Sequence, residues 1–168
     1  MEKWDILNIN REPTGRIAIR GKGLDDGDYH LVVLMIITNS NKEILITKRS
    51  AIKNEPCLWE IPGGAVTAGE TSQEAAIREV GEEVGISLKL EENKGKIIGQ
   101  KTYQSPRGWM VDIWHFEKDV DLNDLILQEE EVSDARWVTR EKVIELIEKG
   151  QFFKGQVFID EVFNKGIL

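Results

Sequence analysis

Apolar and polar residues follow one another along the chain in segments whose spacing predicts a mixture of strands and helices. The run at 30–38, HLVVLMIIT, is continuously apolar, which is typical of a strand covered on both faces. Further segments of strand character span residues 43–49, 86–90, 96–103, 108–118 and 132–138. Helices are predicted at 72–84 and 139–149, with Thr71 or Ser72 and Thr139 as caps and Gly85 and Gly150 as terminators. This mixture predicts an α+β fold with a mixed sheet between helices.

Both ends of the chain extend beyond this central pattern. Residues 4–9 and 16–20 are short strand-like pieces joined by a turn with Pro13 and Gly15, which predicts a hairpin or an extension beside the sheet. Residues 151–168 are rich in phenylalanine and are expected to end as a short helix on the sheet. Core packing and a dimer contact explain that composition equally well. We expect a single domain at 1–168, with a β extension at 1–28, a core at 29–150 and a C-terminal segment at 151–168.

The helix predicted at 72–84 carries a concentration of acidic residues. Glu79, Glu82 and Glu83 stand at positions i, i+3 and i+4, which predicts three carboxylates on one helical face. The opposite face is apolar and is the one that a globular domain buries; it carries Ile77, Val80 and Val84. Like charges at this spacing repel by roughly 0.2–0.5 kcal/mol, and hard divalent cations such as Mg²⁺ take carboxylate ligands. The plainer interpretation is a solvated acidic face.

The segment in front of this helix favours a binding site over a solvated face. Pro62 stiffens the approach, and Gly63 and Gly64 are expected to supply a bend. Gly69 allows a second turn before the helix. These residues predict a loop–helix–turn unit that holds its acids at a defined height. Gly81, inside the helix, is expected to cost about 1 kcal/mol relative to alanine, and we assign it no function.

Composition narrows the class of protein. The chain has 168 residues, of which 40% are apolar and 31% charged, as expected of a globular domain. A net charge of -8 disfavours a nucleic-acid polymer as partner, whereas a small phosphorylated substrate that arrives with Mg²⁺ is compatible with it. Cys57 is the single cysteine, so we expect neither an internal disulfide nor a cysteine-based metal site. Without a membrane-length apolar run or a signal peptide, the expected location is cytoplasmic, with no membrane contact.

The segment 64–86 resembles the Nudix box, Gly-x5-Glu-x7-Arg-Glu-U-x-Glu-Glu-x-Gly-U, where U is a bulky aliphatic residue. Every fixed position is matched, by Gly64, Glu70, Arg78, Glu79, Val80, Glu82, Glu83, Gly85 and Ile86. The resemblance covers roughly residues 30–150 and implies the Nudix fold, an α/β/α sandwich. The stretch WDILNINREPTGR, followed by DYHLVVLMI, also looks like the Nudix subgroup related to isopentenyl diphosphate isomerase.

The resemblance implies metal ligands around the acidic helix. The side chains of Glu79, Glu82 and Glu83 are implied as ligands, together with the backbone carbonyl of Gly63. The implied ion is Mg²⁺, with Mn²⁺ as the alternative. Such ions bridge phosphate oxygens, activate a water and stabilise the negative charge that develops during hydrolysis.

The resemblance also implies residues that assist the chemistry. Many Nudix hydrolases supply one more glutamate from a loop ahead of a tryptophan-containing strand, and by spacing Glu131 is the best match, with Glu130 next. Glu131 would be a further metal ligand or the general base, and Glu79 is the other candidate for the base. Arg78 belongs to the catalytic group but is expected to hold a box glutamate in place. Glu70 is expected to have a supporting role.

Substrate contacts are predicted at two places outside the box. Lys48 and Arg49 end a predicted strand, and Arg49 suits two-point phosphate binding because its guanidinium is planar. Ordinary surface charge explains this pair equally well. The loop at 105–108 lies between two predicted strands, and Arg107 and Trp109 are candidates for holding the distal group of a substrate. An ordinary hairpin tip and a core tryptophan are the alternative interpretation.

The activity implied is Mg²⁺-dependent hydrolysis of a diphosphate linkage in a nucleotide-containing compound. Nucleotide sugars and dinucleotides stay open beside nucleoside di- and triphosphates, which we prefer. A second hypothesis is an isopentenyl diphosphate isomerase, which needs a cysteine acid and histidine ligands. Cys57 stands outside the position required, and no histidine lies between His30 and His115. A third hypothesis is a non-catalytic Nudix-like binding module, against which the complete box argues. A homodimer stays open in each case.

Overall fold

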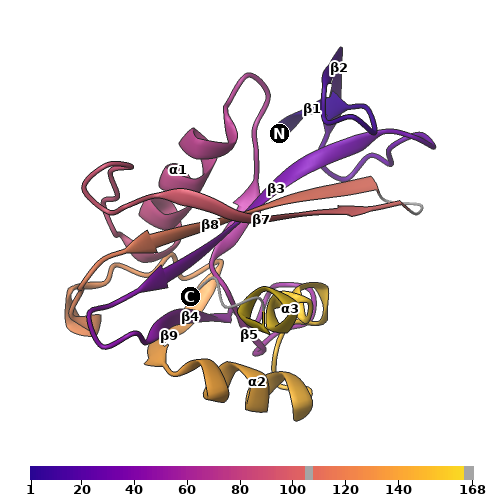
Figure 1. Ribbon diagram of the computed structural model, residues 1–168. Coiled ribbons are helices and arrows are strands. Elements are labelled where there is room, and N and C mark those ends of the chain that lie inside the picture. The colour runs from indigo at the N-terminus through magenta and orange to yellow at the C-terminus, as the bar shows by residue number, and fades with distance from the viewer. Residues whose placement is uncertain (105–107, 165–168) are drawn as a thin grey trace.

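The computed structural model describes residues 1–104 and 108–164. Within this part of the chain one nine-stranded mixed sheet lies between helices (Figure 1). The strands are β1 (Lys3–Leu7), β2 (Pro13–Ile19), β3 (Tyr29–Thr38), β4 (Ile44–Arg49), β5 (Trp59–Glu60), β6 (Gly63–Ala65), β7 (Lys96–Tyr103), β8 (Gly108–Glu117) and β9 (Val132–Val138). The helices are α1 (Ser72–Val84), α2 (Arg140–Glu148) and α3 (Ile159–Asn164), with short 3₁₀ helices η1 (Leu122–Asp124) and η2 (Lys154–Gln156). The predicted α+β sandwich is confirmed.

Strand β3 organises the sheet. It pairs in parallel with β8 along its whole length, and β7 pairs antiparallel with β8 on the far side. On its other edge β3 meets β1, β6 and β4 in succession, and β4 pairs in turn with β5 and β9. Its continuous apolar run is explained by helices on both faces. Val33, Met35 and Ile37 belong to the core cluster with α1, and Leu34 and Ile36 to the cluster with α2 and α3.

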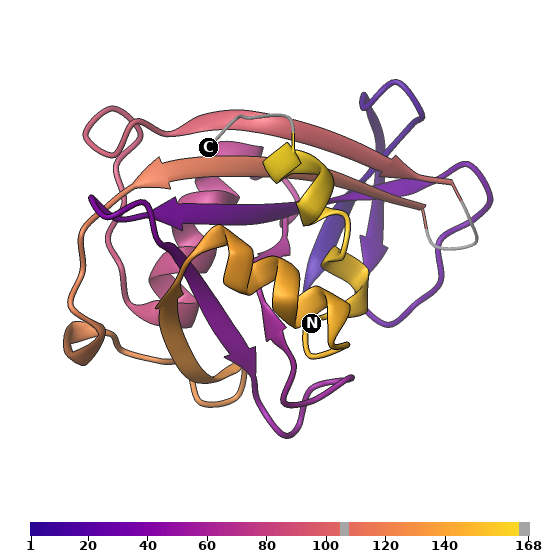
Figure 2. The same ribbon diagram turned by 60° about the horizontal axis from the view of Figure 1, so that its bottom comes forward.

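The two faces of the sheet carry separate cores. Helix α1 packs on one face through small and branched side chains, which contact Trp114 and Phe116 of β8. Helices α2 and α3 cover the other face, where Phe158 and Phe163 are buried (Figure 2). The C-terminal segment therefore ends as a short helix on the sheet, as the sequence predicts. None of the helices in residues 1–104 and 108–164 is long and apolar enough to cross a membrane.

The predicted N-terminal hairpin is confirmed, with strand bounds that differ by a few residues. Strands β1 and β2 pair antiparallel, and β1 also runs beside the loop that leads into α1. The N–H of Ala68 donates to the carbonyl of Lys3 at 2.8 Å, and the N–H of Gly69 donates to Asp5 at 2.7 Å. In the hairpin turn Arg11 forms an ion pair with the buried Asp112 of β8. These contacts join the hairpin to both the sheet and the loop before α1.

Two short regions differ from the sequence predictions. Residues 86–90, expected as a strand, have no strand partner in the described structure. Ile86 and Leu88 still point into the core, and the segment closes in a turn in which the N–H of Lys89 donates to the Asn93 side chain at 2.8 Å. Strands β5 and β6 were not expected. Both are too short for a sequence pattern and exist because β4 and β3 offer them hydrogen bonds.

Candidate functional site

Helix α1 begins and ends where local signals place it. The N–H of Glu74 donates to the Thr71 hydroxyl at 3.2 Å, and the N–H of Thr71 donates to the Glu74 carboxylate at 2.8 Å, which completes a capping box. Gly85 ends the helix in the left-handed region, with φ 72°. The predicted helix at 72–84 is confirmed at both ends. Because the ends are set locally, the direction of each acidic side chain around the helix axis is set as well.

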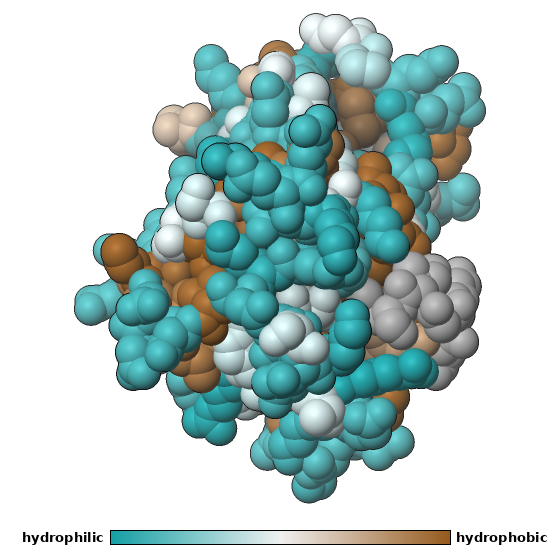
Figure 3. All heavy atoms as spheres, turned by 60° about the vertical axis from the view of Figure 1, so that its left-hand side comes forward, coloured by the Kyte–Doolittle hydropathy of each residue, from teal (hydrophilic) through white to brown (hydrophobic). Residues whose placement is uncertain are grey.

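The three box glutamates differ in exposure, and the expectation that all of them lie opposite the buried apolar face is wrong for Glu83. Glu82 has a side chain that is 54% exposed, that of Glu79 is 14% exposed, and Glu83 is 3% exposed. Glu83 lies with Val80 and Val84 on the buried side of the helix. The helix is turned so that Glu79 and Glu83 lie toward its buried side, while Glu82 stays on the solvent face. The side of the molecule that lies to the left in Figure 1 is covered mainly by hydrophilic side chains (Figure 3).

Gly64 makes room for the Glu79 carboxylate, and Gly63 makes room for strand β3. Both glycines lie in extended strand β6, opposite Leu34 and Val33 of β3, so the expected bend is wrong. A Cβ atom at Gly64 would overlap the carboxyl group of Glu79, and one at Gly63 would lie 2.5 Å from the carbonyl oxygen of Val33. The N–H of Gly63 donates to the Glu83 carboxylate at 3.3 Å. The absence of a side chain at Gly64 therefore lets β6 approach Glu79, while the backbone N–H of Gly63 contacts Glu83.

Arg78 holds the exposed side of this acidic group together. Its Nε and Nη2 donate to Glu70 at 2.8 and 2.9 Å. Its Nη1 donates to Glu79 at 2.8 Å and to Glu82 at 2.9 Å, and Nη2 also reaches the carbonyl of Ala65 at 3.1 Å. The hydrogen bond to Glu70, followed by those to the other acids, raises the pKa of Arg78. The geometry matches the supporting roles expected for Arg78 and Glu70; a part for Arg78 in catalysis stays a prediction.

Two residues that the sequence analysis missed, Lys53 and Glu60, act on the charge of Glu83, and Lys53 also binds Glu131. These three residues and the acids of α1 are called the acidic site below. Nζ of Lys53 lies 2.6 Å from the Glu131 carboxylate and 3.4 Å from that of Glu60. Glu60 is buried on β5, and Glu131 lies in the turn before β9, where its carbonyl accepts from the N–H of Ser50 at 3.0 Å. An acid inside the apolar stretch WEIP was a usable signal for Glu60. Lys53 lies in a loop and offered no local signal.

Arg49 is used by the protein itself. Its Nη1 donates to Glu60 at 2.6 Å, and its Nε donates to the carbonyls of Asn54 and Glu55, each at 3.1 Å. Its guanidinium carbon lies 4.2 Å from the centre of the Phe153 ring, and the side chain is only 9% exposed. The predicted phosphate contact of Arg49 stays a prediction. In this structure its donors are directed at protein groups, and it closes the loop at 50–58.

One of the other two predicted substrate contacts, Trp109, lies at the start of β8. Trp109 is half-buried on this strand, and its ring meets the edge of His30 at 6.0 Å between centroids. His30 stacks on Trp4 at 4.3 Å, and burial lowers the pKa of His30 to about 4. Trp109 thus belongs to an aromatic group shared with the hairpin. Arg107 lies outside the described residues, and both substrate assignments stay predictions.

The negative charges of the acidic site are not fully balanced by positive ones. Burial, and then the charge of Glu60, raise the pKa of Glu83 well above its ordinary value. Burial also raises the pKa of Glu79, although hydrogen bonding to Arg78 opposes this. Burial of a carboxylate without a full counter-charge is costly. The acids at this point therefore favour the arrival of a cation.

The donor set fits a hard divalent cation. Carboxylate and carbonyl oxygens are available from Glu79, Glu83 and the backbone of Gly63, and no nitrogen or sulfur ligand competes with them among the described residues of the acidic site. Over residues 1–104 and 108–164, no three acidic, histidine or cysteine side chains are grouped as a ready metal cage. A complete protein cage is not required of Mg²⁺, which is bound through one or two carboxylates plus substrate phosphates.

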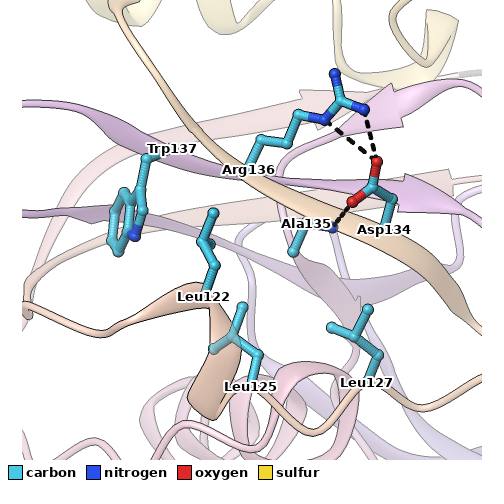
Figure 4. A pocket seen from close by; sticks show the side chains of 7 residues that line it. All are labelled: Leu122, Leu125, Leu127, Asp134, Ala135, Arg136 and Trp137. Carbon is cyan, nitrogen blue, oxygen red and sulfur yellow. Dashed lines mark hydrogen bonds and ion pairs between the residues drawn. The ribbon is translucent and has the colours of Figure 1, made fainter.

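A separate hollow of about 570 Å³ lies between β9 and the segment that contains η1 (Figure 4). Its walls are Leu122, Leu125, Leu127, Asp134, Ala135, Arg136 and Trp137. Figure 4 shows the leucines facing Ala135 and Trp137, while Asp134 and Arg136 bond to each other. None of the predicted site residues lines it.

Comparison with known proteins decides the family. A family model described as the NUDIX domain matches residues 28–160. The chain belongs to the Nudix family. It is 43% identical over 166 residues to a Nudix hydrolase of Listeria monocytogenes, a match that covers 98% of this chain and 95% of that protein. Helix α1 is thus the Nudix helix, and the protein is a Nudix hydrolase, as the box predicts.

Two further relatives refine the picture. The 8-oxo-dGTP diphosphatase of Escherichia coli is 45% identical over 92 residues, which are 51% of this chain and 68% of that protein. The crystal structure of DR0079 from Deinococcus radiodurans superposes with a TM-score of 0.79 at 24% identity, covering 97% of this chain and 98% of that one. The second likeness shows that the fold is shared over nearly the whole chain, the N-terminal hairpin included. The resemblance to the isopentenyl diphosphate isomerase subgroup stays a prediction.

Proposed function

We propose that this Nudix hydrolase is a pyrophosphohydrolase that cleaves a diphosphate linkage in a nucleoside diphosphate derivative, with Mg²⁺ as its cation and Mn²⁺ as the alternative. The observation that carries the proposal is the pair of carboxylates on Glu79 and Glu83. They are withdrawn from solvent against the glycine edge of β6, and burial raises the pKa of both. A cation accompanied by a phosphorylated substrate would offset that cost.

The residues of α1 and β6 have complementary roles in the proposal. Glu79, Glu83 and the Gly63 carbonyl would hold the cation, with Glu82 as the solvent-facing ligand. When bound, the cation would supply Lewis-acid polarisation of phosphate oxygens and a more acidic water. Arg78 orients Glu79, because its guanidinium binds Glu79 through Nη1 while two bonds to Glu70 fix its other edge.

The proton of the attacking water needs an acceptor, and two glutamates stay candidates. Glu131 lies in a turn held by the N–H of Ser50, with its carboxylate on Lys53. It is partly exposed, so a water can reach it. Glu79 lies closer to the proposed cation and is held by Arg78. A carboxylate that accepts a proton must be within hydrogen-bond reach of the water, so the two candidates are separated by comparing the activity of Glu131→Gln and Glu79→Gln.

The proposed partner is a small nucleotide-containing compound, and the proposed compartment is the cytoplasm. The relative from Escherichia coli is named for a nucleoside triphosphate, which supports testing that class first. The isomerase hypothesis gains no support from the described site. Cys57 is exposed in the loop at 50–58, and His115 bonds to the Thr38 hydroxyl within the sheet at 2.8 Å. Assembly as a homodimer stays a prediction.

The test is release of phosphate and pyrophosphate with Mg²⁺ across nucleoside di- and triphosphates, nucleotide sugars and dinucleotides. Glu83→Gln is compared with Glu148→Gln, which changes an exposed acid at the end of α2 in the same chemical way. We expect turnover of at least one compound, abolished by the first substitution and kept by the second. Absence of turnover on the whole panel, or an unchanged rate in Glu83→Gln, would contradict the proposal.

A further inference from the structure

The N-terminal hairpin carries a cation, Arg20, that is held beside the chain segment in contact with the loop before α1. Arg20 directly follows β2, and its N–H donates to the carbonyl of Glu2 at 3.0 Å. Its Nη1 lies 2.7 Å from one carboxylate oxygen of Glu2, and the other oxygen accepts from Nε1 of Trp4 at 2.8 Å. Trp4 in turn stacks on the buried His30. This chain of contacts holds one edge of the Arg20 guanidinium in place.

Two kinds of observation relate Arg20 to the acids Glu79 and Glu131 of the acidic site: backbone contacts and electrostatics. Glu2 adjoins Lys3, whose carbonyl accepts from the N–H of Ala68 in the loop that leads into α1. The hydrogen bond to Glu2 raises the pKa of Arg20, and the charges of Glu131 and Glu79 raise it further. The backbone contacts place the hairpin that carries Arg20 against the loop that leads into the acidic helix α1.

Three other cations of this region, Arg78, Lys53 and Arg49, are bound to protein groups. Arg78 binds three carboxylates, and Lys53 bridges two. Arg49 binds Glu60 and two backbone carbonyls. Arg20 has one carboxylate partner, its side chain is 63% exposed, and within residues 1–104 and 108–164 its Nε and Nη2 donate no hydrogen bond to protein. Its free edge is thus available to an incoming ligand.

We propose that Arg20 binds a phosphate group of the substrate, so that the N-terminal hairpin forms part of the substrate site. A guanidinium binds phosphate through two parallel N–H donors, and Glu2 occupies one corner of the Arg20 fork while leaving the others. The phosphate would sit between Arg20 and the cation held by α1. The inference rests on the proposed diphosphate chemistry and adds to it a residue from outside the Nudix box.

The same hairpin provides a matched control. Arg16, on β2, is also exposed, with a side chain 53% accessible, and is also paired with an acid, Asp28. Its pKa is raised by the hydrogen bond to Asp28 and by the charges of Asp28 and Asp25, none of which belongs to the acidic site. Arg16→Ala therefore removes a positive charge and an ion pair from the same hairpin, and it removes no charge that acts on the acidic site.

The experiment measures binding of methylenediphosphonate, a diphosphate analogue with a P–C–P bridge that is not hydrolysed, by titration calorimetry in excess Mg²⁺. We expect Arg20→Ala to weaken binding about tenfold and Arg16→Ala to change it by less than about twofold. Arg20→Lys, which keeps the charge but loses the fork, should fall between them. Equal affinity of Arg20→Ala and the wild type, or no binding by the wild type at millimolar concentration, would overturn the inference.

A second readout separates an anion contact from damage to the acids. Binding of Mn²⁺ alone, followed by electron paramagnetic resonance, should not be weakened in Arg20→Ala, because the arginine contacts none of the proposed ligands and its positive charge opposes a cation. Loss of Mn²⁺ affinity would also overturn the inference. If the nucleotide panel gives no turnover while diphosphonate binding depends on Arg20, the proposed function fails and the anion contact stands. If the panel gives turnover while diphosphonate binding is independent of Arg20, the anion contact fails and the proposed function stands.

Discussion

Helices α1 and α2 lie on opposite faces of one sheet and begin alike, yet they treat their acidic residues differently. Thr71 caps α1 and Thr139 caps α2, each accepting from the N–H three residues further on. Helix α2 buries only Val143 and Leu146. Helix α1 buries a stripe of small and branched residues that also contains Glu83. The pattern of helical spacing is shared, and the buried carboxylate distinguishes the two.

Glu145 of α2 shows how a helix ordinarily accommodates an acid. It pairs with Lys142 at 2.9 Å and with Lys149, and hydrogen bonds from these lysines lower its pKa to about 2. Glu83 of α1 has a single N–H donor, from Gly63 at 3.3 Å, among the described hydrogen bonds, and burial raises its pKa. Glu145 lies where its charge is satisfied, whereas Glu83 lies where its charge is costly. We infer that Glu83 is kept for chemistry rather than for stability.

Removing each of the two charges in turn should give the largest contrast between the helices. Glu83→Gln should lower kcat/KM by more than about 100-fold, because loss of a metal ligand exceeds the usual cost of losing a neighbour of one. Its thermal midpoint should stay level or rise, since a buried amide costs less than a buried carboxylate. Glu145→Gln should leave kcat/KM unchanged and lower the midpoint slightly. Equal losses of activity in the two variants would remove the distinction.

A second substitution tests the space that β6 leaves for the acids of α1. Gly64→Ala places a Cβ where the Glu79 carboxyl lies, so Glu79 must move. We expect kcat/KM to fall about 10- to 100-fold, the usual consequence of misplacing a reacting group by about 1 Å. The control is Gly23→Ala, where nothing lies within 4 Å of the added atom. If Gly64→Ala keeps full activity, the close approach of β6 to α1 has no functional meaning.

Addition of metal should also stabilise the α2 variant and the α1 variant to different extents. At ten times its dissociation constant, Mg²⁺ should stabilise the wild type by about 1.4 kcal/mol, because it binds the folded chain alone. Glu145→Gln should gain equally, and Glu83→Gln should gain much less. Thermal unfolding with Mg²⁺ and with a chelator measures the difference. A full Mg²⁺ response in Glu83→Gln would exclude this residue as a ligand.

The smallest effect concerns Gly81, which lies on the solvent side of α1. An added Cβ there meets only the carbonyl of Ile86, at 3.9 Å. Gly81→Ala should therefore stabilise the protein by about 1 kcal/mol through helix propensity. Chemical denaturation measures the gain, and kcat/KM should not change. A loss of activity would show that flexibility at this point of the Nudix helix matters.

Local chemistry made much of the fold predictable. The cap at Thr71 and the terminator Gly85 set the bounds of α1, and β7 and β9 have the predicted bounds as well. The errors in the predicted elements lie where strand pairing decides whether a segment becomes a strand. Strand β6 exists because β3 pairs with it, and residues 86–90 lack a strand partner in spite of a strand-like pattern. Hydrogen-bonding partners of this kind come from distant parts of the chain, which no local window contains.

The site divides in the same way. The Nudix box contains Glu79, Glu83 and Arg78 within about two turns of one helix, so spacing alone brings them together. Lys53 comes from a loop and Arg20 from a hairpin, and only folding brings their charges to the acidic site. The sequence offered no sign that these two cations share an electrostatic environment.

The family and the acidic helix could both be read from the amino-acid sequence, because they depend on residue types at fixed spacing along one element. Folding in three dimensions was needed to bury Glu83 while leaving Glu82 exposed, and to direct Arg49 at protein groups instead of open solvent. Whether a side chain is buried or paired depends on which parts of the folded chain come into contact. They depend on how α1 is turned against β6 and on which loops close over β5, and those contacts join segments far apart in the chain.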